Sequence, residues 1–277
     1  LMTNRHVAQI FSSGLGLRNL AFLPGREAGV DFKREKGRTE SNILVVREVV
    51  MIHPYWDMAL LRVDGIGPEH PPLSLTLTTP EELMSQDVAV IGYPAFDPRN
   101  DANVQNTVFG GVYYVKRLQP GKVGPRRTVE SFEHDVPAVT HDSSTLGGNS
   151  GSVVALAKTG QVIGLHFAGV YLDANFAVPS AELAQDGRVI DAGVNFQPAA
   201  QPDSTVSQKW WDGVQTEERA GSRASTAAPP APRPAAKVQP RILTPAATPK
   251  AIPLGTTTVS GREVTFTVPL EISVRLG

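Results

Sequence analysis

The chain has 277 residues, of which 41% are hydrophobic and 19% are charged, as in a typical globular protein. Its formal net charge of −1 gives no electrostatic reason to expect binding to nucleic acid or to a membrane surface. The sequence contains no cysteine, which excludes disulfides, thiol nucleophiles and cysteine-based zinc sites. No apolar run reaches the roughly 18 residues of a membrane span. Nothing in the sequence points to a metal ion or another cofactor, or to a particular compartment.

Several short segments rich in β-branched and apolar residues, bounded by turn residues, predict β-strands. They cover residues 43–52, 58–63, 87–94, 152–156, 161–167 and 176–179. Residues 107–123 predict a hairpin, with breaks at Gly110-Gly111 and Pro120-Gly121. Many short strands with regular turns and almost no helical periodicity indicate an all-β barrel fold.

The composition changes after Asn195. Residues 198–250 hold most of the remaining proline and alanine, and such a stretch buries too little apolar surface to offset its chain entropy. We therefore expect a main domain at 1–195, followed by a disordered Pro/Ala-rich linker at 196–250.

The end of the sequence carries two further features. The pair Trp210-Trp211 interrupts the linker, and it either docks back on the main domain or binds a partner. Residues 251–277 are an expected β tail, in which 263–268 and 270–276 are predicted strands around Pro269. Two strands alone are marginally stable, so they either begin a second domain or pair elsewhere.

The segment Gly147-Gly148-Asn149-Ser150-Gly151-Ser152 places a serine in a turn flanked by glycines. Glycine on either side allows a sharp turn and lets a substrate carbonyl approach the backbone closely. The N–H groups of Gly148 and Ser150 are then candidates for an oxyanion hole, which stabilises the charge that develops in acyl transfer. Glycine–serine turns are common in loops, so this segment needs support from elsewhere in the sequence.

Two upstream segments supply that support. The first contains a histidine that follows an apolar N-terminal start, in Thr3-Asn4-Arg5-His6-Val7. The second contains Asp57, which directly precedes the apolar run Met58-Ala59-Leu60-Leu61. The order His6, Asp57, Ser150, with spacings of 51 and 93 residues, is the order of the chymotrypsin arrangement. Together with the segment around Ser150, these blocks resemble those of trypsin-like serine peptidases.

The resemblance covers roughly residues 1–190 and implies a two-barrel chymotrypsin-like fold with a catalytic cleft between the barrels. In the roles it implies, Ser150 attacks the scissile carbonyl of a protein or peptide, His6 is the general base, and Asp57 orients the imidazole. Each residue alone also has an ordinary structural explanation, so the prediction depends on all three together.

Trypsin-like domains have a few strands before the histidine block, whereas His6 is the sixth residue of this sequence. We therefore expect an N-terminally truncated chain with an incomplete first barrel.

Residues 142–152 most resemble the bacterial glutamyl endopeptidase branch of the family. Ser144 stands where an aspartate would favour substrates with lysine or arginine, so a trypsin-type preference is not expected. In that branch a threonine and a histidine receive the substrate carboxylate, and the resemblance assigns these roles to Thr145 and His166. Alternatively, His166 is a core histidine bonded to backbone, and small or apolar residues are preferred before the scissile bond.

The remaining polar residues near these blocks are less informative. Asn149 replaces the aspartate that pairs with a new N-terminal amine in digestive enzymes, so zymogen activation of that type is not expected. The other histidines share no metal-ligand spacing and are expected at surface or turn positions; they are His53, His70, His134 and His141.

Two other interpretations compete with a serine endopeptidase. The first is a catalytically weak or inactive peptide-binding scaffold, which the missing N-terminal strands favour. The second is an esterase, which the chain order disfavours because α/β-hydrolases run serine, aspartate, histidine. As an endopeptidase, the protein is expected to be bacterial, with a fused or neighbouring C-terminal module as partner or target.

Overall fold

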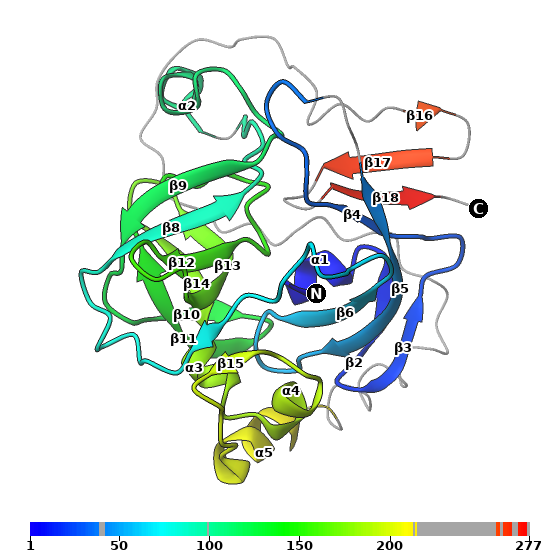
Figure 1. Cartoon of the computed structure of the whole chain (residues 1–277), viewed down its shortest axis with the longest axis vertical. Helices are drawn as coiled ribbons and strands as arrows, with labels where there is room; N and C mark the ends of the chain where they lie inside the picture. The colour runs from blue at the N-terminus through cyan, green and yellow to red at the C-terminus, as the bar shows by residue number, and fades with distance from the viewer. Residues whose placement is uncertain are drawn as a thin grey trace.

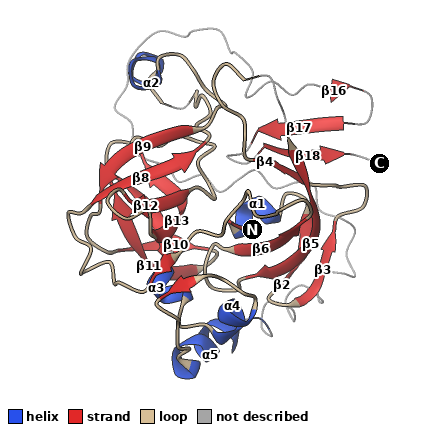
Figure 2. Ribbon diagram, viewed as in Figure 1, coloured by secondary structure: helices blue, strands red, loops and turns tan. Residues whose placement is uncertain are grey.

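The computed structural model describes residues 1–38, 42–98, 100–212 and 214, and the backbone of short strands at 259–260, 263–267 and 271–275. Two β-structured units, built from residues 1–63 and 75–197, lie side by side (Figure 1, Figure 2). The predicted all-β fold with two barrels is confirmed.

The first unit is an open antiparallel barrel. The strands of its sheet follow the order β1 (Met2–Thr3), β6 (Ala59–Val63), β5 (Ile43–Ile52) and β4 (Gly29–Asp31). A hairpin of β2 (Ser12–Leu15) and β3 (Arg18–Phe22) joins the end of β5 through a bridge between Gly16 and Ile52. Along the first half of β5, Leu44 and Val46 face the core while Ile43 and Val45 face outward, as expected of a strand with one buried face. The single-turn helix α1 (Arg5–Ala8) follows β1.

The second unit is a closed barrel. Its strands are β8 (Asp87–Gly92), β9 (Arg117–Lys122), β10 (Arg127–Ser131), β11 (His134–His141), β12 (Val153–Leu156), β13 (Val162–Val170) and β14 (Ala174–Pro179). They pair in the order β10-β11-β14-β13-β12-β8-β9, and a bridge between Val123 and His141 joins the end of β9 back to β11. The short strands β7 (Leu75–Thr76) and β15 (Phe196–Gln197) run parallel to each other, and β7 also pairs with β13.

The hairpin predicted for 107–123 is wrong. This region begins with the end of the helix α2 (Ala102–Phe109), whose first turn is capped by the Asp101 side chain. Gly110, with φ of +60°, is the left-handed C-cap of this helix rather than a hairpin turn. Pro120 lies within the strand β9, opposite Ala89.

The first residues of the segment expected as a linker, 196–212, include regular elements. After the short helices α3 (Ser180–Leu183) and α4 (Gly187–Asp191), the chain forms β15 and then α5 (Ser204–Asp212). Trp210 of α5 is 8% exposed and belongs to the same hydrophobic cluster as Trp56 and Phe176. Trp210-Trp211 therefore docks back on the main domain, which was one of the two alternatives. The rest of the expected linker, from 215 to 250, lies outside the described residues.

Near the C-terminus, β17 (Glu263–Thr267) and β18 (Glu271–Arg275) form an antiparallel pair, in agreement with the two strands predicted around Pro269. A shorter strand, β16 (Val259–Ser260), pairs with β17, and β18 lies beside β4 (Figure 1). Among the helices that the structure describes, none is long and apolar enough to cross a bilayer.

Candidate active site

His6 and Asp57 meet in the first unit, as the sequence predicts. The Asp57 carboxylate accepts from the His6 ring at 2.6 Å (Nδ1 to Oδ2) and from the His6 backbone N–H at 3.0 Å. A carboxylate only accepts, so the ring proton lies on Nδ1 and Nε2 is left with a free lone pair. The Asp57 side chain is 5% exposed and that of His6 is 40% exposed. The pair is therefore arranged as an oriented, accessible base.

The neighbours of His6 hold the loop that carries Asp57. The Asn4 amide donates to the backbone carbonyl of Asp57 at 2.9 Å, and the Arg5 guanidinium donates to the carbonyl of Pro54 at 2.9 Å. Both side chains are buried, and they fix the loop from the side of α1. Asn4 and Arg5 stand in the sequence motif around His6, but nothing in the motif indicates this role for them.

Ser150 lies in the turn between β11 and β12, close to the strand that leads to His6. Gly151 has φ of +82°, and a Cβ added to it would lie 2.8 Å from the Thr3 hydroxyl oxygen. Only glycine therefore allows this turn to pack directly on β1. The Gly151 N–H donates to the carbonyl of His166 at 2.9 Å, which joins the turn to β13. Among the described residues, no hydrogen bond joins the Ser150 hydroxyl to His6.

The turn leaves its predicted oxyanion donors free. The Gly147 carbonyl accepts from the Ala95 N–H at 2.8 Å, and the Asn149 N–H donates to Leu146 at 3.2 Å. In the part of the chain that the structure describes, the N–H groups of Gly148 and Ser150 donate to no protein acceptor. Two unpaired N–H groups on either side of Asn149 are what an oxyanion hole requires.

Asn149 is fully buried and held by a neighbouring strand. Its side chain exchanges hydrogen bonds with Gln119 of β9, at 2.9 Å and 3.3 Å, and donates to the carbonyl of Leu146 at 3.1 Å. A neutral amide pair thus fixes the turn where digestive enzymes use an ion pair. Gln119 was missed because nothing in its local sequence distinguishes it from other polar strand residues.

Two of the three predicted specificity residues are linked through a polar network, and the third is not. The Thr145 hydroxyl donates to the side-chain oxygen of Asn175. The Asn175 amide group in turn donates to the backbone carbonyls of Ser143 at 2.7 Å and His141 at 3.3 Å. His166 contacts the same network through the His141 ring. Ser144 is exposed and makes no hydrogen bond among the described residues.

His166 and His141 form a buried pair of imidazoles. His166 Nδ1 and His141 Nε2 are 3.2 Å apart, and the side chains are 4% and 2% exposed. Burial lowers the pKa of His141 to about 4, and the pKa of His166 lies well below its ordinary value because of burial and the nearby rings of His141 and His6. Both rings are therefore neutral at pH 7. The prediction that His141 occupies a surface or turn position is wrong, because it is a buried residue at the end of β11. His53 does lie in a loop, directly after β5, but it is fully buried.

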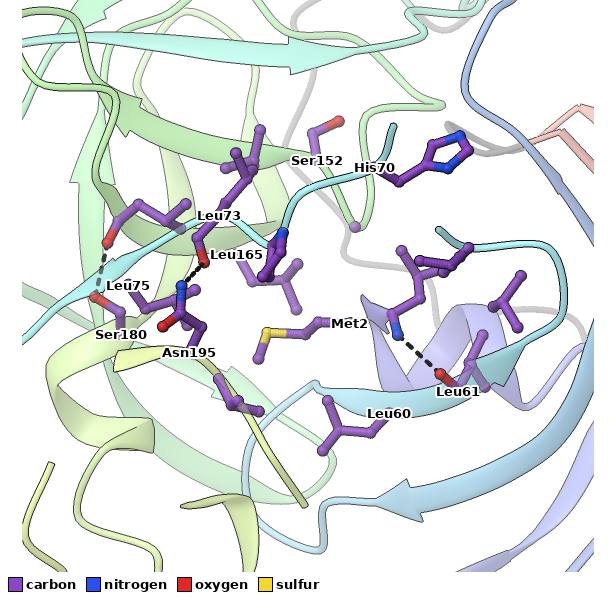
Figure 3. A pocket seen from close by; sticks show the side chains of 18 of the residues that line it. Met2, Leu60, Leu61, His70, Leu73, Leu75, Ser152, Leu165, Ser180 and Asn195 are labelled. Carbon is purple, nitrogen blue, oxygen red and sulfur yellow. Dashed lines mark hydrogen bonds between the residues drawn. The ribbon is translucent and has the colours of Figure 1, made fainter. Parts of the chain in front are cut away.

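A cavity of about 880 Å³ is lined by residues of both units (Figure 3). Apolar side chains such as Met2, Leu60 and Leu165 line it, and Ser152 reaches it from the turn. His6, Asp57 and Ser150 are not among its lining residues, although Gly151 and Ser152 of the same turn are.

Comparisons with known proteins identify the family of the chain. The family described as "Trypsin-like peptidase domain" matches residues 1–165. A curated probable serine protease from Lysobacter enzymogenes is 27% identical over 176 residues, which are 55% of this chain and 44% of that protein. The chain thus spans less than half the length of this curated relative.

Two solved structures are also similar. The active form of a protease from M. tuberculosis matches with 22% identity and a TM-score of 0.42, over 74% of this chain and 71% of that one. A Glu endopeptidase matches with 16% identity and a TM-score of 0.40, over 65% of this chain and 74% of that one. The family match alone covers more than half of the sequence and includes His6, Asp57 and Ser150. The chain therefore belongs to the family of trypsin-like peptidase domains, a family of serine endopeptidases.

Proposed function

We propose that this protein is a serine endopeptidase that hydrolyses peptide bonds with Ser150, His6 and Asp57. The observation that carries the proposal is the His6–Asp57 pair, which leaves His6 Nε2 as a free base beside a turn with two unpaired N–H groups. Family membership supports a protein or peptide as the class of substrate.

The proposed reaction has two stages. The Ser150 oxygen bonds to the scissile carbonyl carbon while His6 Nε2 takes the hydroxyl proton, and the N–H groups of Gly148 and Ser150 stabilise the oxyanion. The imidazolium then protonates the leaving amine as the peptide bond breaks, which leaves an acyl-enzyme. A water molecule attacks the ester, His6 takes its proton and returns it to Ser150, and the carboxylic acid leaves. Asp57 holds the imidazole and stabilises its charged form throughout.

We further propose a preference for glutamate before the scissile bond, as in the glutamyl endopeptidase branch. His141 Nδ1 is buried without a hydrogen-bond partner, and an unpaired buried N–H is costlier than an unpaired acceptor. This favours a proton on His141 Nε2 that is donated to His166 Nδ1, so that His166 carries its own proton on Nε2. His166 is then a neutral donor toward a substrate carboxylate or amide.

The Thr145 hydroxyl already donates its proton to Asn175. For Thr145 to bind the carboxylate directly, this hydrogen bond has to break, so His166 is the stronger candidate. Because His166 is neutral, discrimination between glutamate and glutamine is expected to be moderate.

One observation favours a second candidate, the weakly active peptide-binding scaffold. The Ser150 hydroxyl makes no hydrogen bond to His6 in the described residues. In peptidases without substrate this hydrogen bond is often long and tightens only in the complex, so the observation does not outweigh the proposal.

Labelling with a fluorophosphonate probe, read by intact mass, separates the two candidates. We expect one probe per chain on the unmodified protein, none on Ser150→Ala, and labelling slowed at least about 1,000-fold in His6→Ala. The matched control is Ser152→Ala, two residues along the same turn, whose hydroxyl is buried without a partner. Absence of labelling on a folded unmodified protein would contradict the endopeptidase proposal and support the scaffold.

The preference is tested separately with peptides that differ only before the scissile bond. Cleavage after glutamate is expected to exceed cleavage after alanine, leucine or lysine. Equal or better cleavage after alanine or leucine would overturn the glutamate preference while leaving the endopeptidase proposal intact.

A further inference from the structure

His53 is the centre of the loop that carries Asp57. Its side chain is completely buried, and its Nδ1 accepts the backbone N–H groups of Tyr55 at 3.2 Å and Trp56 at 3.0 Å. The backbone N–H of His53 donates to the carbonyl of Met58 at 2.8 Å, which closes the loop. Since Nδ1 accepts twice, the ring proton lies on Nε2 and points away from the loop.

That proton faces the second unit. His53 Nε2 lies 3.2 Å from Oδ2 of Asp186, and the Asp186 side chain is also fully buried. The same oxygen accepts the indole N–H of Trp211 at 2.5 Å, while Oδ1 accepts the backbone N–H of Arg188 at 2.9 Å. A single carboxylate thus connects the loop of Asp57 to the start of α4 and to α5.

Trp211 also reaches the first unit. A Cβ added to Gly16 would lie 2.9 Å from its ring, so the indole rests directly on this glycine. Gly16 in turn exchanges backbone hydrogen bonds with Ile52, the residue before His53, at 2.7 Å and 3.0 Å. The guanidinium of Arg188 lies 4.4 Å from the centre of the indole. Helix α5 is therefore bound to both units at the base of the loop.

The preceding residue of α5 covers the loop itself. Tyr55 stacks on Trp210 with ring centres 5.7 Å apart, and Trp56 meets the same ring edge-on at 5.9 Å. Both aromatic residues lie between His53 and Asp57 in the chain. The loop is thus fixed from one side by α1 and from the other by α5.

We propose that His53, Asp186 and Trp211 are positioning residues for the Asp57–His6 pair. They form a buried chain of hydrogen bonds, named here the α5 clasp, that holds the loop so that both Asp57 oxygens reach His6. A buried ionisable pair adds little net stability over apolar residues of the same size, so stability alone does not explain it. The inference rests on the proposed function, because the α5 clasp acts on catalysis only through the triad.

The test uses the full chain and two variants that weaken the α5 clasp at different points. His53→Asn keeps an acceptor for the loop N–H groups but is too short to reach Asp186, and Trp211→Phe keeps a ring but loses its N–H. The matched control is Val206→Ala, which trims the packing of α5 on the same hydrophobic cluster without touching the α5 clasp.

The first readout is the ring proton that His6 shares with Asp57, observed by ¹H–¹⁵N NMR of the histidine rings and assigned by its loss in Asp57→Asn. We expect this downfield signal in the unmodified protein and in Val206→Ala, and expect it shifted or broadened in both α5 clasp variants. The second readout is the pH dependence of fluorophosphonate labelling. Its midpoint is expected to move to lower pH, with the rate reduced about 10-fold or more in His53→Asn and about 2- to 5-fold in Trp211→Phe.

Two outcomes decide the matter. If both variants keep the signal and the pH profile of the unmodified protein and lose only thermal stability, as Val206→Ala does, the α5 clasp is overturned. If the unmodified protein does not react with the probe but the His6 signal depends on the α5 clasp, the proposed function fails and the positioning role stands. Should His53→Asn fail to fold, Trp211→Phe gives the same decision.

Discussion

Gly148 shows how a single backbone angle prepares the candidate oxyanion hole. Its φ of +91° is one that residues with a side chain rarely adopt, and an added Cβ would lie 2.8 Å from the Tyr93 carbonyl oxygen and 3.0 Å from Ala95. Any larger residue must move the peptide, and the N–H of residue 148 moves with it. A side chain at position 148 is therefore expected to displace a proposed oxyanion donor as well as to strain the turn.

We expect Gly148→Ala to lower kcat about 100-fold with little change in KM, because one donor to the oxyanion is lost. Steady-state kinetics on a glutamyl peptide measures kcat and KM separately. The matched control is Gly160→Ala in the turn between β12 and β13, where φ is +73° and no atom lies within 4 Å of the added Cβ. A Gly148→Ala variant with kcat like that of the control would exclude this N–H from the oxyanion hole.

His166 gives the proposed glutamate preference a pH dependence. Burial and the rings of His141 and His6 hold its pKa well below the ordinary value, so the free pocket is neutral at pH 7. A bound carboxylate next to the ring raises this pKa, and binding therefore takes up a proton as the pH falls. A glutamine side chain does not have this effect.

The ratio of kcat/KM for paired glutamate and glutamine peptides is thus expected to rise from pH 8 to pH 6. Taking the ratio cancels the shared pH dependence of the base. The rise is expected to disappear in His166→Gln, which keeps an amide donor but does not titrate. A ratio that stays constant, or falls, in the unmodified protein would rule out His166 as the carboxylate receptor.

At the scale of elements, local patterns predicted strands better than helices. The segments 43–52 and 161–167 have many β-branched residues between turn residues, and the predicted strands are present there as β5 and β13. The helix α2 gave no such signal, because Val104 and Val108 lie on its exposed face and its stability comes from the capping residue and from packing.

In the candidate site, too, some residues could be predicted from local sequence motifs and others could not. His6 and Asp57 could be paired from sequence because each stands in a contiguous block with a recognisable spacing. The hydrogen bonds from His53 to Asp186 and from His141 to His166 join residues 133 and 25 positions apart, and neither has a local pattern. Such contacts follow from the closure of the barrels, which composition and periodicity do not specify.

Helix α5 was missed because its neighbours are rich in proline and polar residues, while its stability comes from tertiary packing of Trp210 and Trp211. This gives a prediction at Gly16, where φ is +66° and an added Cβ would lie 2.9 Å from the Trp211 ring. Gly16→Ala is expected to push α5 away and to lower stability by about 1–3 kcal/mol more than backbone strain alone.

Near-UV circular dichroism during thermal unfolding measures both the tryptophan packing and the stability. Gly37→Ala is the control that measures the cost of backbone strain alone, because Gly37 has φ of +79° and no atom lies within 4 Å of the added Cβ. Equal losses in the two variants would show that Trp211 does not rest on Gly16 in solution.

At the scale of the molecule, three buried hydrophobic clusters are joined by polar contacts. One cluster fills the first barrel, one fills the second, and the third lies between them and includes Trp56, Phe176 and Trp210. The buried histidine His53 packs edge-on against Trp210 of this third cluster, and His166 follows Leu165 of the same cluster in β13. The candidate site and the packing between the barrels are therefore close together. Conditions that charge these rings therefore act on folding and activity together.

Three buried histidines are expected to make the protein sensitive to mild acid. Burial lowers the pKa of His53, lowers that of His141 to about 4, and lowers that of His166 well below its ordinary value. In the unfolded chain the same rings titrate near pH 6.5, so between that pH and their folded values the unfolded state binds more protons. The free energy of unfolding is then fully maintained above about pH 6.5 and decreases as the pH falls below it, by up to about 1.4 kcal/mol per pH unit for each histidine.

Urea unfolding between pH 7.5 and pH 5.0 measures this slope above the range in which most carboxylates titrate. His141→Gln removes one titrating ring while keeping a polar side chain in the network, so the slope is expected to fall by about 1.4 kcal/mol per pH unit or less. His134→Gln is the matched control, because His134 is half-buried at the start of β11 and lies outside the buried pair. A free energy of unfolding that stays constant from pH 7.5 to pH 5.0 would mean that the histidines reach water without unfolding, and the closed packing between the barrels would be contradicted.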